Sequence, residues 1–122
     1  MILNSLSPFL YTENFQETIK FYTEVLEFVC LTENPSFWAC LEKDGIQFFV
    51  SLPNEHTGFV KAGFTGSFYF KTSNVDEIWD KLKDLAKICY PIEDFDYGMR
   101  EFAIYDNNGY LLQFGQDLVT DL

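Results

Sequence analysis

The sequence predicts an α+β fold made of two β-α-β-β-β modules, and three observations support this prediction. One segment is repeated, a short aromatic run precedes each copy, and three apolar runs follow each copy. The first copy, "TENFQETIKFY", runs from Thr12 to Tyr22, and the second, "TSNVDEIWDKL", runs from Thr72 to Leu82. Both begin Thr-x-Asn and place a Glu three residues after the Asn. A chain of 122 residues that repeats itself in this way indicates a single domain, 1–122, whose two repeats share a core.

The element that opens each module is predicted to be a strand. "LSPFLYT" (6–12) and "GSFYFKT" (66–72) are short and rich in aromatic residues, as strands often are. Successive side chains of a strand point to opposite faces, so one face of each strand is expected to pack on a helix. The other face is then free for a ligand or a partner: Ser7, Phe9 and Tyr11 in the first module, and Ser67, Tyr69 and Lys71 in the second.

A helix is predicted after each opening strand. Asn14 with Glu17, and Asn74 with Glu77, have the spacing of a capping-box-like pair at a helix start. Apolar residues then recur at helical spacing, which indicates amphipathic helices that pack on the sheets. They are Phe15, Ile19, Tyr22 and Leu26 in the first helix, and Val75, Ile78, Trp79, Leu82 and Leu85 in the second.

Three more strands are predicted to complete each module. They are "FVCLTE" (28–33), "SFWACLE" (36–42) and "IQFFVSL" (46–52), then "KICYPI" (87–92), "REFAIYD" (100–106) and "YLLQFG" (110–115). Asn107, Asn108 and Gly109 give the last pair a strong hairpin-turn signal. The repeats therefore span about 5–52 and 66–116, and the aperiodic segment 53–65 is predicted to be the linker.

The charge balance excludes several classes of partner. The net charge is −11, from 8 Lys plus Arg against 19 Asp plus Glu. Such a chain repels phosphate backbones and anionic lipid surfaces, so we expect neither nucleic acid nor a membrane as a partner. The same field attracts cationic ligands.

The location is expected to be cytoplasmic. No run of about 20 apolar residues and no signal peptide is present, and the three cysteines form no disulfide or zinc motif.

Two motifs resemble those of the vicinal oxygen chelate superfamily, which includes glyoxalase I, extradiol dioxygenases and bleomycin-resistance proteins. "NFQETIKFYTEVLEF" is similar to the family's D-x-x-x-S-x-x-F-Y-x-x-x-L-G-F, with Thr18 for the Ser and Glu27 for the Gly. "YGMREFAIYDNNGYLLQFGQ" is similar to the family's G-R-E-F-x-x-x-D-P-x-G-N-x-x-x-F ending, with Asn107 for the Pro. The resemblance covers about 6–116 and implies that the paired modules form a curved open barrel.

The resemblance also implies where a metal ion would be bound. Metal-using members of the family take ligands from the first and last strands of each module. These positions correspond here to Ser7, Ser67, Gln113 and either Phe49 or Val50. Divalent metals prefer imidazole, carboxylate or thiolate donors, so we expect no metal and no cofactor. The only histidine, His56, falls in the predicted linker. No Ser, Cys or carboxylate has a partner arrangement that predicts a catalytic residue.

The sequence therefore favours a metal-free binding protein of the bleomycin-resistance type. Its ligand would be a small aromatic, in some cases cationic, molecule held in a concave crevice. The resemblance implies a homodimer with this crevice at the subunit interface, and it leaves open whether an N-terminal strand is exchanged. The predicted lining residues are Ser7, Phe9, Tyr11, Trp38, Phe49, Ser67, Tyr69, Tyr97 and Gln113. Two alternatives remain: a glyoxalase-like lyase or isomerase with an unorthodox metal site, and a non-catalytic scaffold module.

Overall fold

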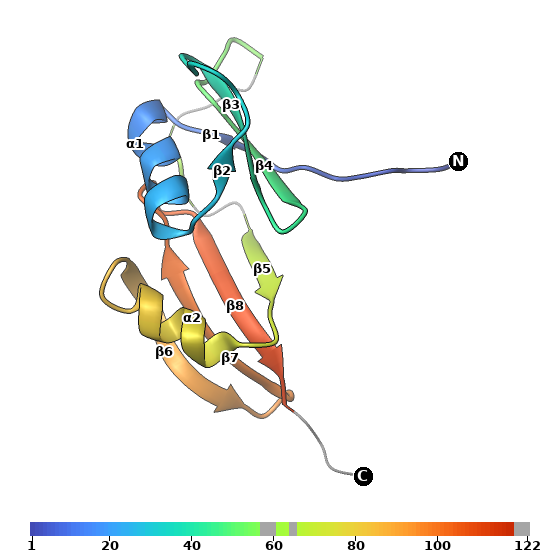
Figure 1. The fold of residues 1–122 in the computed structure, drawn as a ribbon, viewed down its shortest axis with the longest axis vertical. Coiled ribbons are helices and arrows are strands. Elements are labelled where there is room, and N and C mark those ends of the chain that lie inside the picture. The colour runs from blue at the N-terminus through green and yellow to red at the C-terminus, as the bar shows by residue number, and fades with distance from the viewer. Residues whose placement is uncertain (57–60, 64–65, 119–122) are drawn as a thin grey trace. The chain divides into compact units, whose positions relative to one another are not determined.

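A computed structural model describes residues 1–56, 61–63 and 66–118 of the chain (Figure 1). The chain divides into two compact units, Met1–Ala62 and Gly63–Leu122, and each unit is described by itself. The predicted linker 53–65 includes residues 57–60 and 64–65, which lie outside the described residues.

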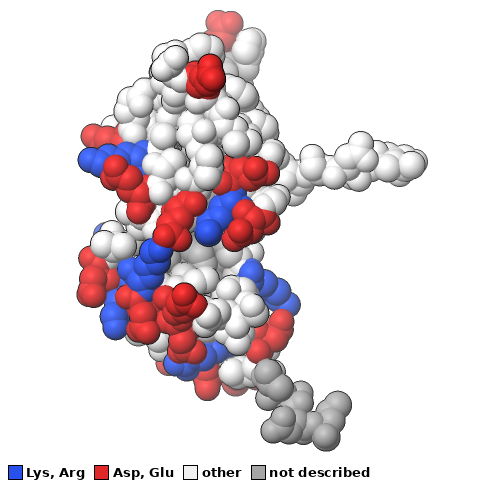
Figure 2. Space-filling model, in the orientation of Figure 1, with Lys and Arg blue, Asp and Glu red and all other residues white. Residues whose placement is uncertain are grey.

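The first unit is a β-α-β-β-β module. Its elements are β1 (Phe9–Tyr11), α1 (Phe15–Lys20), the π-helical turn η1 (Phe21–Val25), β2 (Val29–Cys30), β3 (Trp38–Lys43) and β4 (Ile46–Ser51). The sheet order is β1-β4-β3-β2, in which β1 runs parallel to β4 and the other neighbours are antiparallel. Residues 1–6 precede this sheet as an exposed extended arm without charged side chains, which is the white projection in Figure 2.

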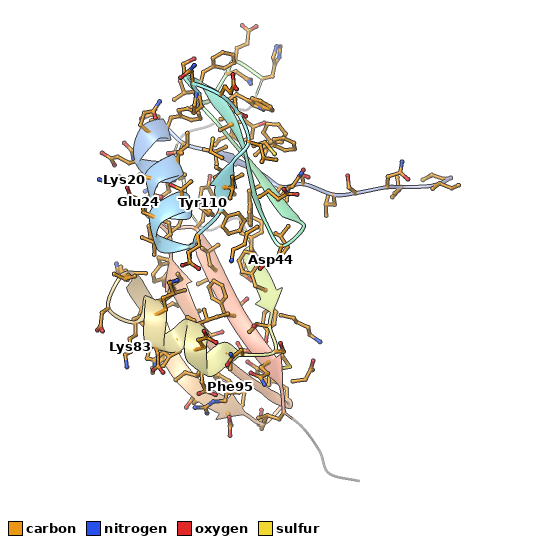
Figure 3. The ribbon with its side chains drawn as sticks, in the orientation of Figure 1. Lys20, Glu24, Asp44, Lys83, Phe95 and Tyr110 are labelled. Carbon is orange, nitrogen blue, oxygen red and sulfur yellow. The ribbon has the colours of Figure 1, made fainter. Side chains whose placement is uncertain are left out.

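The core of the first unit lies between its helix and one face of its sheet. Leu10, Leu41 and Val50 are almost fully buried there. Tyr22 and Phe48 close the core with ring centroids 5.7 Å apart. The opposite side of the helix carries Lys20 and Glu24, which are exposed and point away from the sheet (Figure 3). This is the amphipathic arrangement that the apolar spacing predicts.

The second unit repeats the same topology. Its elements are β5 (Ser67–Lys71), α2 (Val75–Leu82), β6 (Lys87–Phe95), β7 (Met99–Tyr105) and β8 (Leu111–Asp117). The sheet order is β5-β8-β7-β6, again with the first and last strands of the module parallel. The predicted α+β class and the β-α-β-β-β order of both modules are therefore confirmed. Neither four-stranded sheet closes on itself.

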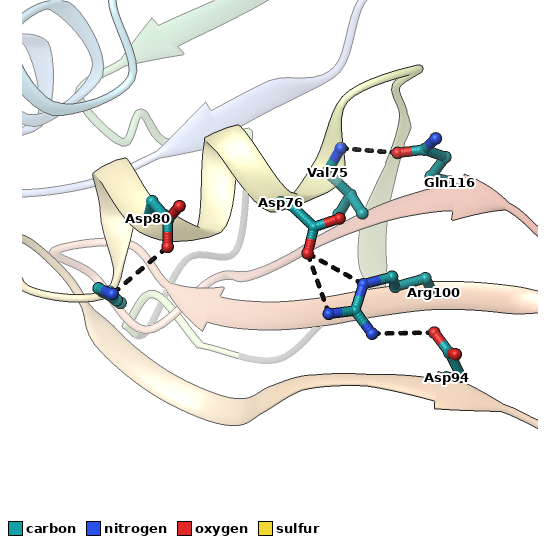
Figure 4. A network of polar contacts seen from close by, with 7 residues as sticks. Val75, Asp76, Asp80, Asp94, Arg100 and Gln116 are labelled. Carbon is teal, nitrogen blue, oxygen red and sulfur yellow. Dashed lines mark hydrogen bonds and ion pairs between the residues drawn. The ribbon is translucent and has the colours of Figure 1, made fainter.

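Aromatic stacking and one arginine fix α2 on the second sheet. Phe102 and Phe114 stack with centroids 5.2 Å apart, and Trp79 of α2 meets Phe102 edge-on at 5.1 Å. Arg100 of β7 donates from Nε and Nη2 to Asp76 Oδ1 of α2, at 3.0 and 2.9 Å, and from Nη1 to Asp94 Oδ1 of β6, at 2.9 Å (Figure 4). Gln116 Oε1 accepts the backbone N–H of Val75, the first residue of α2, at 2.9 Å.

The repeated Thr-x-Asn motif has a structural explanation that differs from the predicted one. The hydroxyl of Thr12 accepts the backbone N–H of Asn14 at 2.9 Å, and the hydroxyl of Thr72 accepts that of Asn74 at 3.1 Å. Neither asparagine side chain forms a hydrogen bond that caps its helix, so the predicted capping boxes are wrong. A short polar side chain that bonds a backbone N–H two residues on is a known way to turn the chain. The threonine therefore turns the chain from strand into helix.

Several element boundaries differ from the prediction. Ser7 lies before β1, whereas the predicted strand included it. β2 has only two residues, and β6 extends to Phe95. The helix ends in the wider η1 turn, and Glu27 follows it with a φ of 64°. That left-handed conformation is where glycine is favoured, which explains why the resembling motif has Gly at this position.

No helix within the described part of the chain is long and apolar enough to span a bilayer.

Candidate functional site

Each sheet has one face that its own helix does not cover, and we call it the open face of that unit. The strand register assigns its residues, because directly paired residues point to the same face. The open face of the first unit carries Phe9, Tyr11, Trp38, Cys40, Glu42, Gln47, Phe49 and Ser51. The open face of the second unit carries Ser67, Tyr69, Lys71, Lys87, Tyr90, Glu93, Phe95, Met99, Glu101, Ala103, Tyr105, Leu111, Gln113, Gly115 and Asp117.

A row of stacked rings occupies the open face of the first unit. Phe9 and Phe49, which are paired across β1 and β4, stack with centroids 4.8 Å apart. Trp38 stacks on the other side of Phe49 at 5.7 Å, and Tyr11 stacks on Phe9 at 5.8 Å. Phe9 remains 46% exposed and Trp38 38% exposed. The structure thus brings together the four rings predicted to line a site in this unit.

The register also resolves the alternative between Phe49 and Val50. Phe49 pairs with Phe9 on the open face, whereas Val50 is fully buried on the helix side. Phe49 is therefore the last-strand residue that corresponds to Gln113, because Gln113 pairs with Tyr69 in the same way.

A buried carboxylate lies on the open face of the second unit. Glu101 of β7 is only 1% exposed. Its Oε1 accepts the hydroxyl of Tyr69 at 2.7 Å, and its Oε2 accepts the hydroxyl of Tyr90. Tyr97, in the turn after β6, lies near enough for Glu101 to contribute to its raised pKa. Two phenols, one from β5 and one from β6, thus donate to the same carboxylate.

The predicted residues Ser67 and Gln113 extend this network. Ser67 Oγ donates to Gln113 Oε1 at 2.6 Å, and Gln113 Nε2 donates to Tyr90 Oη at 2.9 Å. We call Ser67, Tyr69, Tyr90, Tyr97, Glu101 and Gln113 the tyrosine–glutamate cluster. Within it, Ser67 donates to Gln113 and Gln113 donates to Tyr90. Tyr90 and Tyr69 donate to Glu101, so each series of hydrogen bonds ends at this carboxylate.

The cluster keeps its phenols protonated. Burial raises the pKa of Tyr69 and of Tyr90, and hydrogen bonding to Glu101 raises both further, while the Gln113 contact to Tyr90 lowers that one somewhat. Desolvation and the neighbouring Glu101 carboxylate raise the pKa of Tyr97 to about 12. An unperturbed phenol has a pKa of about 10. At neutral pH all three phenols are therefore protonated, and Tyr69 and Tyr90 donate hydrogen bonds to the carboxylate.

Gly115 makes room for this arrangement. It pairs with Glu101 across β7 and β8. A Cβ at this position would lie 2.0 Å from Tyr69 Oη and 2.7 Å from Tyr69 Cζ. The absence of a side chain at residue 115 thus allows the Tyr69 ring to cross β8 and reach Glu101.

Two predicted site residues lie at the margins of these faces. Ser7 precedes β1 and is half-buried. Tyr97 is 60% exposed and stacks on Phe95 at 5.3 Å with an interplanar angle of 15°. Phe95, labelled in Figure 3, also meets the ring of Tyr90 edge-on at 5.6 Å.

Three residues of the cluster and its frame were not among the predicted site residues: Tyr90, Glu101 and Gly115. The signal for Glu101 is present in the sequence, because it is the one acidic residue inside the otherwise apolar run "EFAIY". Strand alternation also puts it on the same face as Gln113. The signal for Tyr90 is weaker, because register shifts between Ile88 and Glu93 interrupt the alternation of β6.

The described residues do not assemble a metal site. Over residues 1–56, 61–63 and 66–118, no group of three or more His, Cys, Asp or Glu side chains is placed to hold an ion. Ser67 and Gln113, which meet at the position that the resemblance assigns to metal ligands, offer a hydroxyl and an amide. His56 lies apart from the strands with an exposed side chain, 3.4 Å from Glu55.

Residues 3–114 match the sequence-family model described as the Glyoxalase/Bleomycin resistance protein/Dioxygenase superfamily. The chain belongs to this superfamily. No match is found among curated proteins. Superfamily membership and the paired modules agree with the resemblance that the two sequence motifs indicate.

Solved structures share the superfamily fold with this chain. A superfamily member from Sphaerobacter thermophilus DSM 20745 has a TM-score of 0.80 at 19% identity, covering 96% of this chain and 100% of that one. TioX from Micromonospora sp. ML1 has a TM-score of 0.73 at 23% identity, covering 94% and 100%. Lactoylglutathione lyase from Agrobacterium tumefaciens has a TM-score of 0.68 at 15% identity, covering 93% and 94%. At these identities the likeness concerns the fold.

Proposed function

We propose that this superfamily member is a metal-free binding protein of the bleomycin-resistance type that sequesters a small aromatic molecule. The observation that supports it best is the ring stack of Phe9, Phe49 and Trp38 on the open face of the first unit, in which Phe9 and Trp38 are exposed. Exposed contiguous apolar surface on a water-soluble protein is typical of a binding site. A flat ligand that extends this stack would continue a geometry the rings already have.

The expected binding energy comes from ring stacking and apolar burial. Covering about 100 Å² of apolar surface contributes about 2.5 kcal/mol at ~25 cal/mol per Å². Stacked aromatic pairs add about 0.5–1.5 kcal/mol each. These terms need no covalent step, so the protein would act by mass action and hold the ligand away from its target. Resistance to an aromatic antibiotic would be one consequence.

The proposal includes a homodimer in the cytoplasm, with the ligand crevice at the subunit interface and without nucleic acid or membrane partners. The exposed arm 1–6 and the exposed rings favour association with a second copy, because both leave apolar surface in water. Sedimentation velocity tests the dimer directly, since a monomer would have a mass of only 14.3 kDa.

Trp38 provides the test of ligand binding. The chain has two tryptophans, and Trp79 is half-buried on α2, where it meets Phe102 edge-on. In Trp79→Phe, the remaining Trp38 fluorescence should change on titration with a bleomycin or with tryptamine. In Trp38→Phe, the remaining Trp79 should report no change.

Affinity is then measured by calorimetry, where Trp38→Ala should weaken binding about tenfold or more, as expected for an aromatic hot spot. Trp79→Phe is the matched control and should retain wild-type affinity. Absence of heat across a panel of flat aromatic ligands, with folded protein, would contradict the proposal and favour a scaffold whose rings only pack against another subunit.

A further inference from the structure

The tyrosine–glutamate cluster contains a buried negative charge that plays no part in the proposed ring stacking. Glu101 is 1% exposed, and among the described residues no Lys, Arg or His forms an ion pair with it. A buried carboxylate is costly unless hydrogen bonds or an opposite charge compensate it. Here the compensation comes from neutral phenol donors alone. The negative charge is therefore still available to a cation at the surface of the cluster.

The direction of the hydrogen bonds decides which ligand groups fit. The phenol hydrogens of Tyr69 and Tyr90 are committed to Glu101, and Tyr90 Oη already accepts the Gln113 amide. A phenol oxygen can also accept a hydrogen bond. Tyr69 and Tyr97 are 41% and 60% exposed, so their oxygens can accept donors from solvent or from a ligand. The cluster thus offers acceptors, with a carboxylate behind them, and no free cationic donor for an anion.

Aromatic faces surround the same position. Tyr97 and Phe95 form a stacked pair, and the Tyr90 ring contacts Phe95. Ring faces attract ammonium and guanidinium groups, by about 0.5–2 kcal/mol depending on desolvation. Acceptors, a buried negative charge and ring faces together are the chemistry that recognises an organic cation.

We infer that the tyrosine–glutamate cluster is a recognition site for a protonated amine or guanidinium group of a small aromatic molecule, whose ring lies on the stacked Phe95–Tyr97 pair of the same unit. The ammonium hydrogens are donated to the oxygens of Tyr69 and Tyr97, and Glu101 supplies the counter-charge through them. Carboxylates and phosphates are rejected, because they would place a second negative charge beside Glu101. This inference concerns the second unit alone and goes beyond the proposed function, which is supported by the ring stack of the first unit.

A matched pair of ligands separates the inference from the proposed function. Tryptamine carries an indole and an ammonium group, and tryptophol carries the same indole with a neutral hydroxyl group. Calorimetric titration of the wild-type protein should show tryptamine binding about tenfold or more tightly, since hydrogen bonds to charged groups contribute about 1.5–3 kcal/mol. Equal binding of the two would overturn the inference and leave the proposed function standing. Binding of neither would count against both.

Variants locate the effect in the cluster. Glu101→Gln should reduce the preference for tryptamine over tryptophol to less than about threefold, and tryptophol affinity should stay within about twofold of wild type. Asp84→Asn is the matched control, because it removes the same charge from an exposed residue beyond α2 and should retain the preference. If Glu101→Gln does not fold, Tyr97→Phe replaces it, since that residue is exposed and its ring is retained. An unchanged preference in both cluster variants would overturn the inference.

Discussion

At the scale of single residues, Gly115 controls the position of Tyr69. Any other residue at 115 would put a Cβ 2.0 Å from the Tyr69 hydroxyl oxygen, which is far shorter than a contact that proteins tolerate. The ring must then leave its place over β8, and Glu101 loses one of its donors. The cluster therefore depends on a residue that takes no part in its hydrogen bonds.

We predict that Gly115→Ala destabilises the protein by about 1–3 kcal/mol, the cost of overpacking or of a buried acceptor that loses its partner. Urea unfolding followed by circular dichroism measures the change. Gly63→Ala is the matched control, because a Cβ there has nothing within 4 Å, and it should be within about 0.5 kcal/mol of wild type. A Gly115→Ala protein as stable as wild type would show that Tyr69 does not need its present position.

The sequence predicts the ring positions better than the polar ones. Phe9, Phe49 and Trp38 follow from strand alternation, because a period of two is regular over short strands. Glu101 was not predicted, because its role depends on phenols that arrive from β5 and from β6. Strand alternation indicates the face on which Glu101 lies, but the convergence of the phenols on it is a tertiary property that no local pattern encodes.

At the scale of elements, the two sheets carry different chemistry at equivalent positions. Phe9 pairs with Phe49 in one sheet, and Tyr69 pairs with Gln113 in the other. In the neighbouring strands, Trp38 pairs with Ser51, and Glu101 pairs with Gly115. One framework thus presents rings in the first unit and a hydrogen-bonded carboxylate in the second. The two units share their strand register, and they differ in the residues of their open faces.

The cluster also links β5, β6 and β7, and this link should depend on pH. The folded pKa values of Tyr69, Tyr90 and Tyr97 are raised, and that of Tyr97 is about 12. A raised folded pKa means that the unfolded chain loses its protons first as the pH rises. The stabilising contribution is therefore complete below pH ~10, the unfolded value, and is lost as the pH rises through 12 and above.

We accordingly predict that, at pH 11, fewer phenols are ionised in the folded chain than in the chain unfolded in urea, as measured by tyrosinate absorbance at 295 nm. Between pH 9 and pH 11 the free energy of unfolding should fall more steeply for the wild type than for Tyr69→Phe, which has one phenol fewer to ionise. Equal phenol ionisation in the folded and unfolded chains would contradict the hydrogen-bonded cluster.

Element types were predictable, but several of their ends were not. The aromatic runs and apolar spacing predict both helices and all eight strands. The asparagines did not cap the helices, because Thr12 and Thr72 bond their backbone N–H groups instead. The shift from α1 to η1 and the left-handed Glu27 reflect how the chain must turn into β2, which helical periodicity alone does not determine.

At the scale of the whole molecule, the net charge favours one class of ligand. The net charge of −11 favours cations over anions at the surface, and the cluster would add a local carboxylate to that field. On α2 the acidic side chains Asp76, Glu77 and Asp80 outnumber the basic side chain of Lys81, and both kinds lie at the surface (Figure 2). Superfamily membership was predictable from two motifs, because they cover the helix of the first module and the final hairpin of the second.

The central claim is that this protein binds its ligand by ring contact and hydrogen bonding, without a metal ion. The most direct test is equilibrium dialysis against Zn²⁺, Mn²⁺ and Ni²⁺, followed by metal quantification and by tryptamine titration with and without EDTA. We predict far less than one bound ion per chain and an unchanged tryptamine affinity in EDTA. One tightly bound ion per chain, with ligand binding lost on chelation, would contradict the account.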